Sequence, residues 1–389
     1  MSTRFRRIRK ILSSLQTAWS IAGVSVVLVV VLEAGFRVGF AIKDWRDDSQ
    51  AVAARRVAEA QGDPVWPLVN ARELGRLADR FSPWVYFRQR PFHGQTITID
   101  ENGRRATWQP PGASESRAGR RPLVVFLGGS TLWGYGARDM HTIPSLVAQR
   151  LFERGRAVDV QNQAEIGYVS TQELVALQLE LRDGLRPDVV VFFDGVNDTT
   201  SAALEGHAGL STNESNRVAE FNLRQSAPRL GRALGARLIE DSGLYRFARF
   251  VRRRLGAGGL DMPRSFDPRL ASDVAECYAG NVAIIRGLGR QYGFRPFFFW
   301  QPVVFTKTTR TALEQDEAAR FAPLESIFRA VHEQLKKSPE LASAADFHDL
   351  SALFDNQSDG AFIDYCHTTE KANERIADLM REAILEALP

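Results

Sequence analysis

Two stretches decide the fold: residues 122–130 read PLVVFLGGS, and residues 188–198 read DVVVFFDGVND. In each stretch a continuous apolar run ends in a glycine turn that carries polar side chains. A strand that is apolar on both faces is typical of the centre of a parallel sheet covered by helices on both sides. The two stretches therefore predict neighbouring central strands of such a sheet.

Strand-like and helix-like segments alternate outward from these two runs. We expect five strands, at residues 122–127, 158–161, 188–193, 296–301 and a weak fifth at 345–350. We expect helices at 141–154, at 171–182 with Thr171 as the N-cap, and at 272–292, 311–337 and 368–388. This alternation predicts an α/β fold with a parallel sheet and right-handed crossovers over residues 121–389.

Two segments do not follow this alternation of strands and helices. Residues 44–120 are expected to form a juxtamembrane tether followed by a β-hairpin, with strands at 96–99 and 104–108 around an Asn-Gly turn. Residues 202–269 are rich in Arg, Gly, Ser and Asn and interrupt the alternation. An insertion of this length near strand ends predicts a cap or lid.

The composition excludes several classes of protein. Apolar residues make up 44% of the 389 residues and charged residues 25%, which argues against wholesale disorder, a fibrous repeat and a multi-span membrane protein. The net charge of +4 is concentrated in an amino-terminal cluster of Arg4, Arg6, Arg7, Arg9 and Lys10. Because the rest of the chain is close to neutral, no nucleic-acid partner is expected.

The amino terminus predicts a membrane anchor. Residues 15–32 read LQTAWSIAGVSVVLVVVL, without one charge, and with residues 34–36 the run is long enough to span a bilayer. The basic cluster before it predicts a cytoplasmic amino terminus and an exported domain. We therefore assign residues 1–43 to a basic arm and an uncleaved, single-pass signal anchor. A cleaved signal peptide and a buried helix of a soluble domain remain alternatives.

Polar residues gather at the carboxyl ends of the predicted strands, where open α/β sheets bind ligands. Ser130 follows the first strand at a Gly-Gly turn that leaves its hydroxyl exposed. A serine hydroxyl needs a base to remove its proton, and the candidate is His367. Asp364 lies three residues earlier and can orient the imidazole. His348, between Asp346 and Asp349, is the alternative base.

Three donors are candidates for stabilising an oxyanion: the amides of Ser130 and Gly167 and the side chain of Asn197, each after a predicted strand. Asp198 is expected to cap the segment that follows it and to orient the loop. Gln301, which ends the fourth strand, is a candidate substrate contact.

These residues resemble the SGNH hydrolases, also called the GDSL esterases and lipases. The first motif of that family corresponds to residues 128–134 (GGSTLWG), with Gly129 where the family name has Asp. The second has its glycine at Gly167, the third (Gly-x-Asn-Asp) is residues 195–198, and the fourth (Asp-x-x-His) is residues 364–367.

The resemblance covers residues 121–389 and implies a three-layer α/β/α, flavodoxin-like sandwich with five parallel strands. It also implies the site roles: Ser130 as nucleophile, His367 as base, Asp364 as its partner, and Ser130, Gly167 and Asn197 as the oxyanion hole. The family's aspartate is not a member of the triad, so Gly129 removes no catalytic role.

No cofactor is expected, because acyl transfer through a serine needs none, and the spacing of the other histidines indicates no metal site. Cys277 and Cys366 are the two cysteines of the chain. An exported domain meets an oxidising compartment, so we expect a disulfide between them that braces the catalytic loop. Two buried free thiols are the alternative.

The sequence thus predicts a membrane-anchored serine esterase that hydrolyses a carboxylic ester, such as an acetyl ester on a glycan or a lipid, on the exported side. An O-acetyltransferase acting on an envelope or exported polysaccharide would use the same site and remains open. A third possibility is a non-catalytic binding or assembly subunit built on the same fold.

Overall fold

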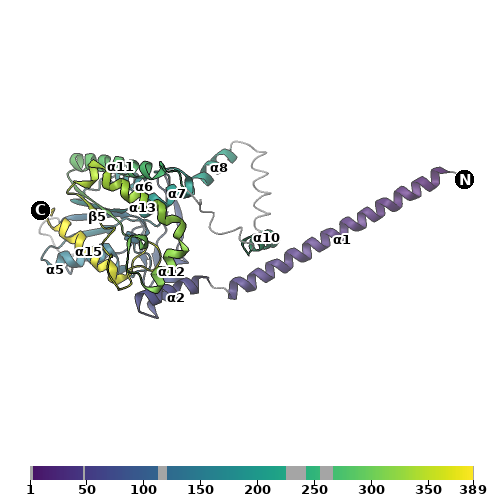
Figure 1. Cartoon of the computed structure of the whole chain (residues 1–389), viewed down its shortest axis with the longest axis horizontal. Helices are drawn as coiled ribbons and strands as arrows, with labels where there is room; N and C mark the ends of the chain where they lie inside the picture. Colours follow the sequence, from purple (N-terminus) through teal and green to yellow (C-terminus); the bar gives the residue numbers. More distant parts are fainter. Residues whose placement is uncertain (1–2, 47–48, 113–120, 225–241, 255–265, 389) are drawn as a thin grey trace. The chain divides into compact units, whose positions relative to one another are not determined.

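The structure, a computed structural model, describes residues 3–46, 49–112, 121–224, 242–254 and 266–388. Its centre is a five-stranded parallel sheet with the order β6-β5-β7-β8-β9 (Figure 1). The strands are β5 (Leu123–Gly128), β6 (Asp159–Asn162), β7 (Val189–Asp194), β8 (Arg295–Trp300) and β9 (Phe347–Asp349). All five lie within two residues of the predicted segments, and the parallel α/β class is confirmed.

The register of the two central strands brings their polar turns together. β5 pairs with β7 from Val124↔Val189 to Gly128↔Phe193. Every residue of β7 is buried, and so is all of β5 after its first residue. Apolar burial on both faces keeps these strands at the middle of the sheet. The turns after Gly128 and Asp194 consequently leave the same edge of the sheet side by side.

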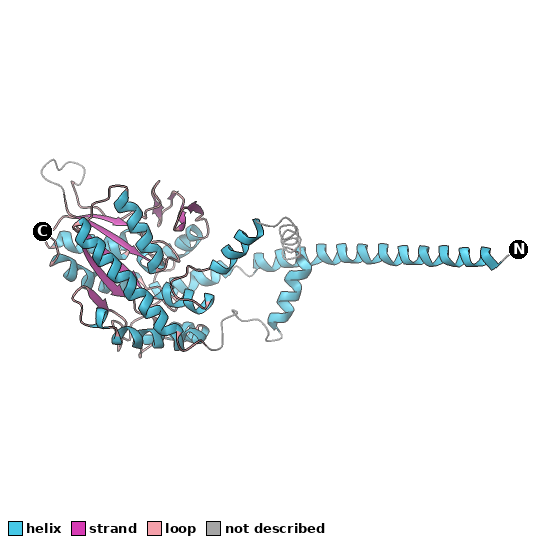
Figure 2. Cartoon of the chain, turned by 90° about the horizontal axis from the view of Figure 1, so that it is seen from above, coloured by secondary structure: helices cyan, strands magenta, loops and turns pink. Residues whose placement is uncertain are grey.

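Helices cover both faces of the sheet and complete the three layers (Figures 1 and 2). On one face α5 (Ile143–Glu153) packs against α15 (Glu370–Leu385). On the other face α11 (Leu270–Tyr292) packs against its neighbours α6 (Ser170–Arg182), α7 (Val196–Glu205) and α13 (Ala322–Lys337). Shorter elements are α4 (Ser130–Trp133), α8 (Glu214–Arg224), α12 (Ala312–Arg320), α14 (Pro339–Ala342), η1 (Asp139–His141) and η2 (Val304–Thr306).

Three helix boundaries differ from the prediction. The helix expected at 311–337 is two helices, α12 and α13, because Pro323 lies in the first turn of α13, where a missing N–H costs nothing. Helix α6 begins at Ser170, so Thr171 is inside the helix and does not cap it. Helix α15 begins at Glu370, because Thr369 is the N-cap and its hydroxyl accepts from the amide of Ala372.

The segment before the sheet packs with it as one compact unit, which consists of residues 50–215 and 262–389. It contains α2 (Ser49–Gln61), α3 (Trp66–Leu74), and two small antiparallel pairs, β1 (Asp79–Ser82) with β2 (Tyr86–Gln89) and β3 (Phe92–His93) with β4 (Thr98–Ile99). The expected turn at residues 100–103 forms, but the hairpin does not continue: β4 pairs with β3, and after the turn a single bridge joins Ile99 to Arg105. The tether is therefore shorter than expected.

A second unit groups residues 1–49 with residues 216–261. Its described elements are α1 (Thr3–Arg46), α10 (Gly243–Arg254) and most of α8. Within α1, Trp19–Phe40 is apolar enough to cross a bilayer, with a mean hydropathy of 2.1 and exposed side chains. The predicted insertion at 202–269 is thus divided: residues 202–205 end α7, and α10 packs on α1. Its residues 225–241 and 255–265 lie outside the described residues.

Candidate active site

Ser130 lies at the start of α4, one residue after the end of β5. A Cβ atom added to Gly128 would lie 2.9 Å from the carbonyl oxygen of Phe193, so only glycine permits this approach of β5 to β7. Gly134 ends α4 in the left-handed region, with φ +101°. The sharp exit from the strand leaves Ser130 at the carboxyl edge of the sheet with 8% of its surface exposed.

Ser130, His367 and Asp364 form one hydrogen-bonded chain. The Oγ atom of Ser130 lies 2.7 Å from Nε2 of His367, and Nδ1 of His367 lies 2.6 Å from Oδ2 of Asp364. The structure therefore brings together the three predicted residues, although Ser130 lies more than 230 positions from Asp364 and His367. In this arrangement an imidazole can accept the serine proton while the carboxylate holds its tautomer.

The loop before α15 holds Asp364 in its charged form. Burial alone would raise the pKa of Asp364, but the nearby His367 charge, its side-chain hydrogen bond and the backbone amides of His367 and Cys366 together lower the pKa below its ordinary value. Those amides donate to Oδ1 at 2.8 Å and 2.9 Å. Oδ2 thus remains directed at the imidazole.

Tyr135 covers the imidazole of His367, a contact that the sequence did not reveal. The two rings stack with centroids 4.3 Å apart and an interplanar angle of 26°. Tyr135 follows Gly134, so the glycine that ends α4 also places this ring. Burial, followed by the charge of Asp364, raises the pKa of the Tyr135 hydroxyl. The neutral ring limits the freedom of the imidazole on one face.

The alternative base, His348, lies elsewhere. It is part of β9, and its ring stacks on Phe299 at 4.7 Å. Asp349 pairs with His332 at 2.7 Å instead of with His348. Burial lowers the pKa of His348. His348 is thus a half-buried histidine that packs on the sheet, and of the two candidates His367 is the one that reaches Ser130.

A sequence model described as the GDSL-like Lipase/Acylhydrolase family matches residues 126–375. The chain belongs to this family. It is therefore an ester-hydrolysing enzyme, and the matched range contains both Ser130 and His367.

Solved structures to which the chain is similar include the lipase Lip_vut3 from a goat rumen metagenome, which is 12% identical, with 67% of this chain and 97% of that chain covered and a TM-score of 0.40. A lipase/acylhydrolase from Enterococcus faecalis is 14% identical, with 69% and 97% covered and a TM-score of 0.35. An acetyl xylan esterase, AlAXEase, is 16% identical, with 67% and 99% covered and a TM-score of 0.33. A search of curated proteins found no match.

The glycine that replaces the GDSL aspartate has a steric consequence here. A Cβ atom on Gly129 would lie 2.2 Å from Nδ2 of Asn197 and 3.7 Å from the carbonyl oxygen of Tyr168. Nδ2 of Asn197 donates to that oxygen at 2.7 Å. The absence of a side chain at Gly129 therefore lets Asn197 cross between the turn after β5 and the loop after β6.

The second GDSL motif contributes the loop that holds Gly167. Gly167 has φ +88°, which favours glycine, and a Cβ there would meet only open space. Asp198, expected to cap the segment that follows it and to orient the loop, accepts from the amide and hydroxyl of Ser170 at 3.2 Å and 2.6 Å. It therefore joins the Asn197 turn to the start of α6, beside the Gly167 loop.

Gln301, the predicted substrate contact, bonds within the protein through its side-chain nitrogen. Only 5% of it is exposed, and its Nε2 donates to Oγ1 of Thr131 at 2.8 Å and to the carbonyl oxygen of Cys366 at 3.1 Å. The end of β8 thus connects the residue after Ser130 to the residue before His367. The sequence placed Gln301 at the correct edge of the sheet but could not show which way its side chain points.

The disulfide expected between Cys277 and Cys366 is not formed, since both thiols are free. Cys277, on α11, lies 4.0 Å from Oγ1 of Thr171, whereas the Cys366 sulfur lies 3.7 Å from Nδ1 of His367. Ligand atoms of Asp364, Cys366 and His367 lie within 4.8 Å of one another. Burial raises the pKa of the Cys366 thiol well above its ordinary value.

Arg105 is a further residue that the sequence did not reveal. It is 2% exposed, and its guanidinium donates to the carbonyl oxygens of Gly134 and Ala137, both at 2.6 Å, and to Asp139 at 3.0 Å. Its guanidinium also lies 4.2 Å from the ring centroid of Trp133. The segment before the sheet therefore secures the loop that follows Ser130.

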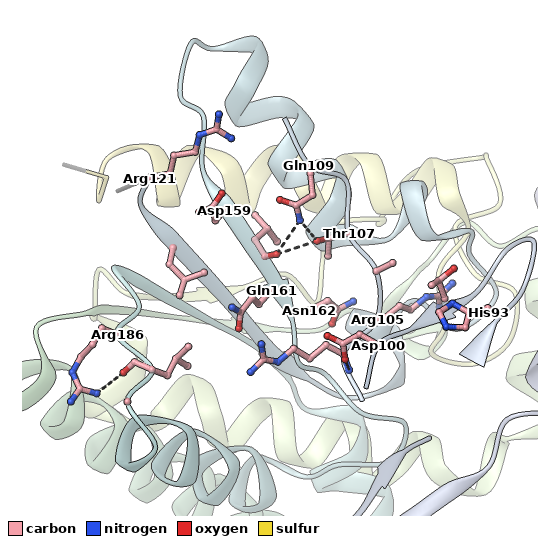
Figure 3. Close-up of a pocket in the computed structure, with 17 residues that line it drawn as sticks. His93, Asp100, Arg105, Thr107, Gln109, Arg121, Asp159, Gln161, Asn162 and Arg186 are labelled. Carbon is pink, nitrogen blue, oxygen red and sulfur yellow. Dashed lines mark hydrogen bonds between the residues drawn. The ribbon is translucent and has the colours of Figure 1, made fainter. Parts of the chain in front are cut away.

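A separate hollow lies along the outer strand β6, and none of Ser130, Asp364 and His367 lines it (Figure 3). Two of its arginines bond within the protein: Arg104 pairs with Glu180 at 3.0 Å, and Arg186 donates to the carbonyl oxygen of Leu185 at 2.7 Å. This hollow is thus distinct from the candidate active site.

Proposed function

We propose that the chain is a serine esterase in which Ser130 is the nucleophile, His367 the general base and Asp364 the residue that orients the imidazole. The observation that carries the proposal is the continuous chain of hydrogen bonds from Ser130 Oγ through His367 to Asp364. Family membership supports ester hydrolysis, and this chain of contacts identifies the atoms that would perform it.

The reaction proceeds in two steps. Oγ of Ser130 attacks the ester carbonyl carbon while Nε2 of His367 takes its proton, and the carbonyl π electrons move to the oxygen. When the tetrahedral intermediate collapses, the C–O bond to the alcohol breaks and the leaving oxygen receives the proton from His367. Water then repeats the sequence on the acyl-enzyme and frees the acid and Ser130.

The oxyanion would receive hydrogen bonds from the amides of Ser130 and Gly167 and from Nδ2 of Asn197. The Asn197 amide has two hydrogens, and the bond to Tyr168 uses one of them. The second hydrogen is the one we assign to the oxyanion. Tyr168 thus sets the direction of the Asn197 amide before substrate arrives.

We further propose that α1 anchors the enzyme with its amino terminus in the cytoplasm and its catalytic domain exported. The apolar span Trp19–Phe40 and the basic cluster before it support this orientation. Esters within reach of such an enzyme are acetyl esters of envelope or extracellular glycans, and lipids. Protease treatment of spheroplasts tests the orientation: the exported domain is expected to be digested, and protection of the domain would refute it.

Turnover of p-nitrophenyl acetate tests the nucleophile. Ser130→Ala is expected to lower kcat by at least about 10⁴-fold, because no acyl-enzyme can form. Ser343→Ala, an exposed serine at the end of α14, is the matched control and should leave turnover unchanged. A fluorophosphonate probe should label the wild type and lose its target in Ser130→Ala and His367→Ala, but not in His348→Ala. Assaying acetylated glycans for both free acetate and transferred acetyl groups separates hydrolysis from acyl transfer.

A further inference from the structure

An acidic residue near the end of the apolar span of α1 has specific partners on α10. Glu33 accepts hydrogen bonds from the backbone amides of Gly243 and Leu244 at 2.8 Å and 3.0 Å. Arg37, one turn along α1, donates to the same carboxylate at 2.6 Å. The first amides of a helix lack internal partners, and a carboxylate there also meets the positive end of the helix dipole. Glu33 therefore caps α10.

The two helices also touch closely beyond this cap. A Cβ atom on Gly243 would lie 2.9 Å from the amide nitrogen of Arg37, so α10 can begin here only with glycine. Phe36 stacks on Phe247 with ring centroids 4.2 Å apart. One turn further along both helices, Phe40 meets Phe250 edge to face at 6.2 Å. These contacts position α10 against residues 33–40 of α1.

The sequence of α10, GLYRFARFVRRR, contains five arginines and no acidic residue. Arg246 and Arg249 are exposed, and the guanidinium of Arg246 lies 4.7 Å from the ring centroid of Phe40. Phe247 remains 38% exposed although it stacks on Phe36. A helix that combines exposed aromatic side chains with arginines is typical of helices that lie in a membrane interface.

We propose that α10 lies on the exported surface of the bilayer, where its arginines bind the phosphate groups of anionic phospholipids. The end of an apolar span marks the boundary between hydrocarbon and headgroups, and α10 packs on α1 at that end. Each arginine near an anionic surface contributes to binding. The inference rests on the anchoring by α1 proposed above and is independent of the esterase chemistry.

In this placement the insertion would serve as a membrane contact and not as a lid. The chain leaves the sheet unit after residue 215 and returns to it at residue 262. Through α10 the insertion would give the enzyme a second attachment to the membrane in addition to α1. Because Glu33 fixes the start of α10, the two attachments would act as one.

A cysteine pair tests the contact between α1 and α10. The full chain carries Cys277→Ser, to remove the more accessible native thiol, with Phe36→Cys and Phe247→Cys, and is reconstituted in lipid nanodiscs. Mild oxidation should give an intrachain disulfide. The pair Val24→Cys with Phe247→Cys, in which the first cysteine lies about 18 Å from Phe36 along α1, is the control that should not cross-link. A disulfide between two chains would overturn the proposal, because α10 would then serve as a contact between copies.

Lipid contact is tested with a fluorophore on Ala248→Cys, an exposed position of α10, in the same Cys277→Ser chain. Quenching by spin-labelled lipid is expected in nanodiscs containing phosphatidylglycerol. Arg246→Gln with Arg249→Gln should lower the ratio of docked to undocked α10 by about 30-fold, since each arginine near an anionic surface contributes about fivefold. The control, Arg290→Gln with Arg375→Gln, removes two exposed arginines from α11 and α15 and should change nothing.

Equal quenching with and without the two α10 arginines would overturn the assignment of anionic lipid. An absence of quenching in the chain that keeps both arginines would overturn the membrane placement. A chain that does not incorporate into nanodiscs at all would refute the anchor and the inference together. Turnover of p-nitrophenyl acetate by the same samples stays unchanged in every case, so a failure of the esterase proposal is recognised separately.

Discussion

Gly129→Ala is the smallest change that should disable the site without unfolding the protein. The added Cβ would lie 2.2 Å from Nδ2 of Asn197, whereas contacts under 3.0 Å essentially never occur for real Cβ atoms. Nδ2 must therefore withdraw by more than about 1 Å to reach ordinary van der Waals separation. It would lose the 2.7 Å bond to Tyr168 and the position that we assign to the oxyanion donor.

Two independent estimates of the effect agree. Loss of one oxyanion donor costs about 100- to 1,000-fold in kcat, or about 3–4 kcal/mol, and a misplacement of about 1 Å costs about 100-fold. The cost in stability is small, because the displaced atom is the end of a flexible side chain. One lost hydrogen bond is worth about 1 kcal/mol, which lowers the Tm of a domain of this size by about 2–4 °C.

A double-mutant cycle tests whether Gly129→Ala acts through Asn197. Turnover of p-nitrophenyl acetate and thermal unfolding are measured for both single variants and for the double variant Gly129→Ala/Asn197→Ala. If the clash displaces Asn197, the double variant should be no slower than Asn197→Ala alone. Gly280→Ala on α11, where a Cβ meets nothing within 4 Å, is the neutral control. Additive losses, or full activity in Gly129→Ala, would refute the reasoning.

Three further changes probe the charges and the buried polar contacts. Asp364→Asn should lower kcat by about 10⁴-fold, because an amide no longer holds the required tautomer of His367; a loss of less than about tenfold in steady-state kinetics would contradict that role. Burial raises the pKa of Glu165 from 4.5 to about 8, so between those values the folded protein keeps a proton that the unfolded chain has lost, and the free energy of unfolding falls as the pH rises. Glu165→Gln should flatten that fall in urea titrations across the window, and an unchanged slope contradicts the assignment. Arg105→Met should cost about 3–5 kcal/mol in urea unfolding, since it removes a buried guanidinium that bonds to Asp139 and to two carbonyl oxygens. Arg104→Met, at a partly exposed ion pair, should cost less than about 1 kcal/mol, and equal costs would contradict the structure.

Most of the fold could be predicted from local patterns in the sequence. The strands were predictable because apolar runs such as 189–193 are buried on both faces, and that property needs no knowledge of the neighbours. The boundary between α12 and α13 could also have been predicted, because a proline such as Pro323 is typical of the first turn of a helix. The helical pattern that runs across both helices instead favoured one long helix. The meeting of Ser130, His367 and Asp364 was predictable from their positions at strand ends and before the last helix, and their catalytic roles remain predictions.

Contacts between distant segments were not predictable. Nothing in the residues around Arg105 indicates that its guanidinium reaches carbonyl groups about 30 positions later, because such contacts depend on how the segment before the sheet folds back. The same holds for Glu33: in the sequence it marks only the end of an apolar run, and its partner Gly243 lies 210 positions away. The loop-like composition of the insertion predicts a cap or lid, and it does not indicate that α10 packs on α1.

The position of the reacting atoms depends on residues that touch no substrate. Ser130 and His367 are separated by 237 residues of chain, so the chain itself does not hold them together. A site loses activity when its groups shift by about 0.5 Å. The amide of Gln301 bonds at once to Thr131 and to the carbonyl of Cys366, the neighbours of those two residues, so neither segment can move without breaking a buried hydrogen bond. Arg105 holds the other end of the α4 turn through the carbonyl of Gly134. Breaking these bonds would leave buried polar groups unpaired, which is costly. The sheet and the segment before it therefore hold Ser130 and His367 at their 2.7 Å separation.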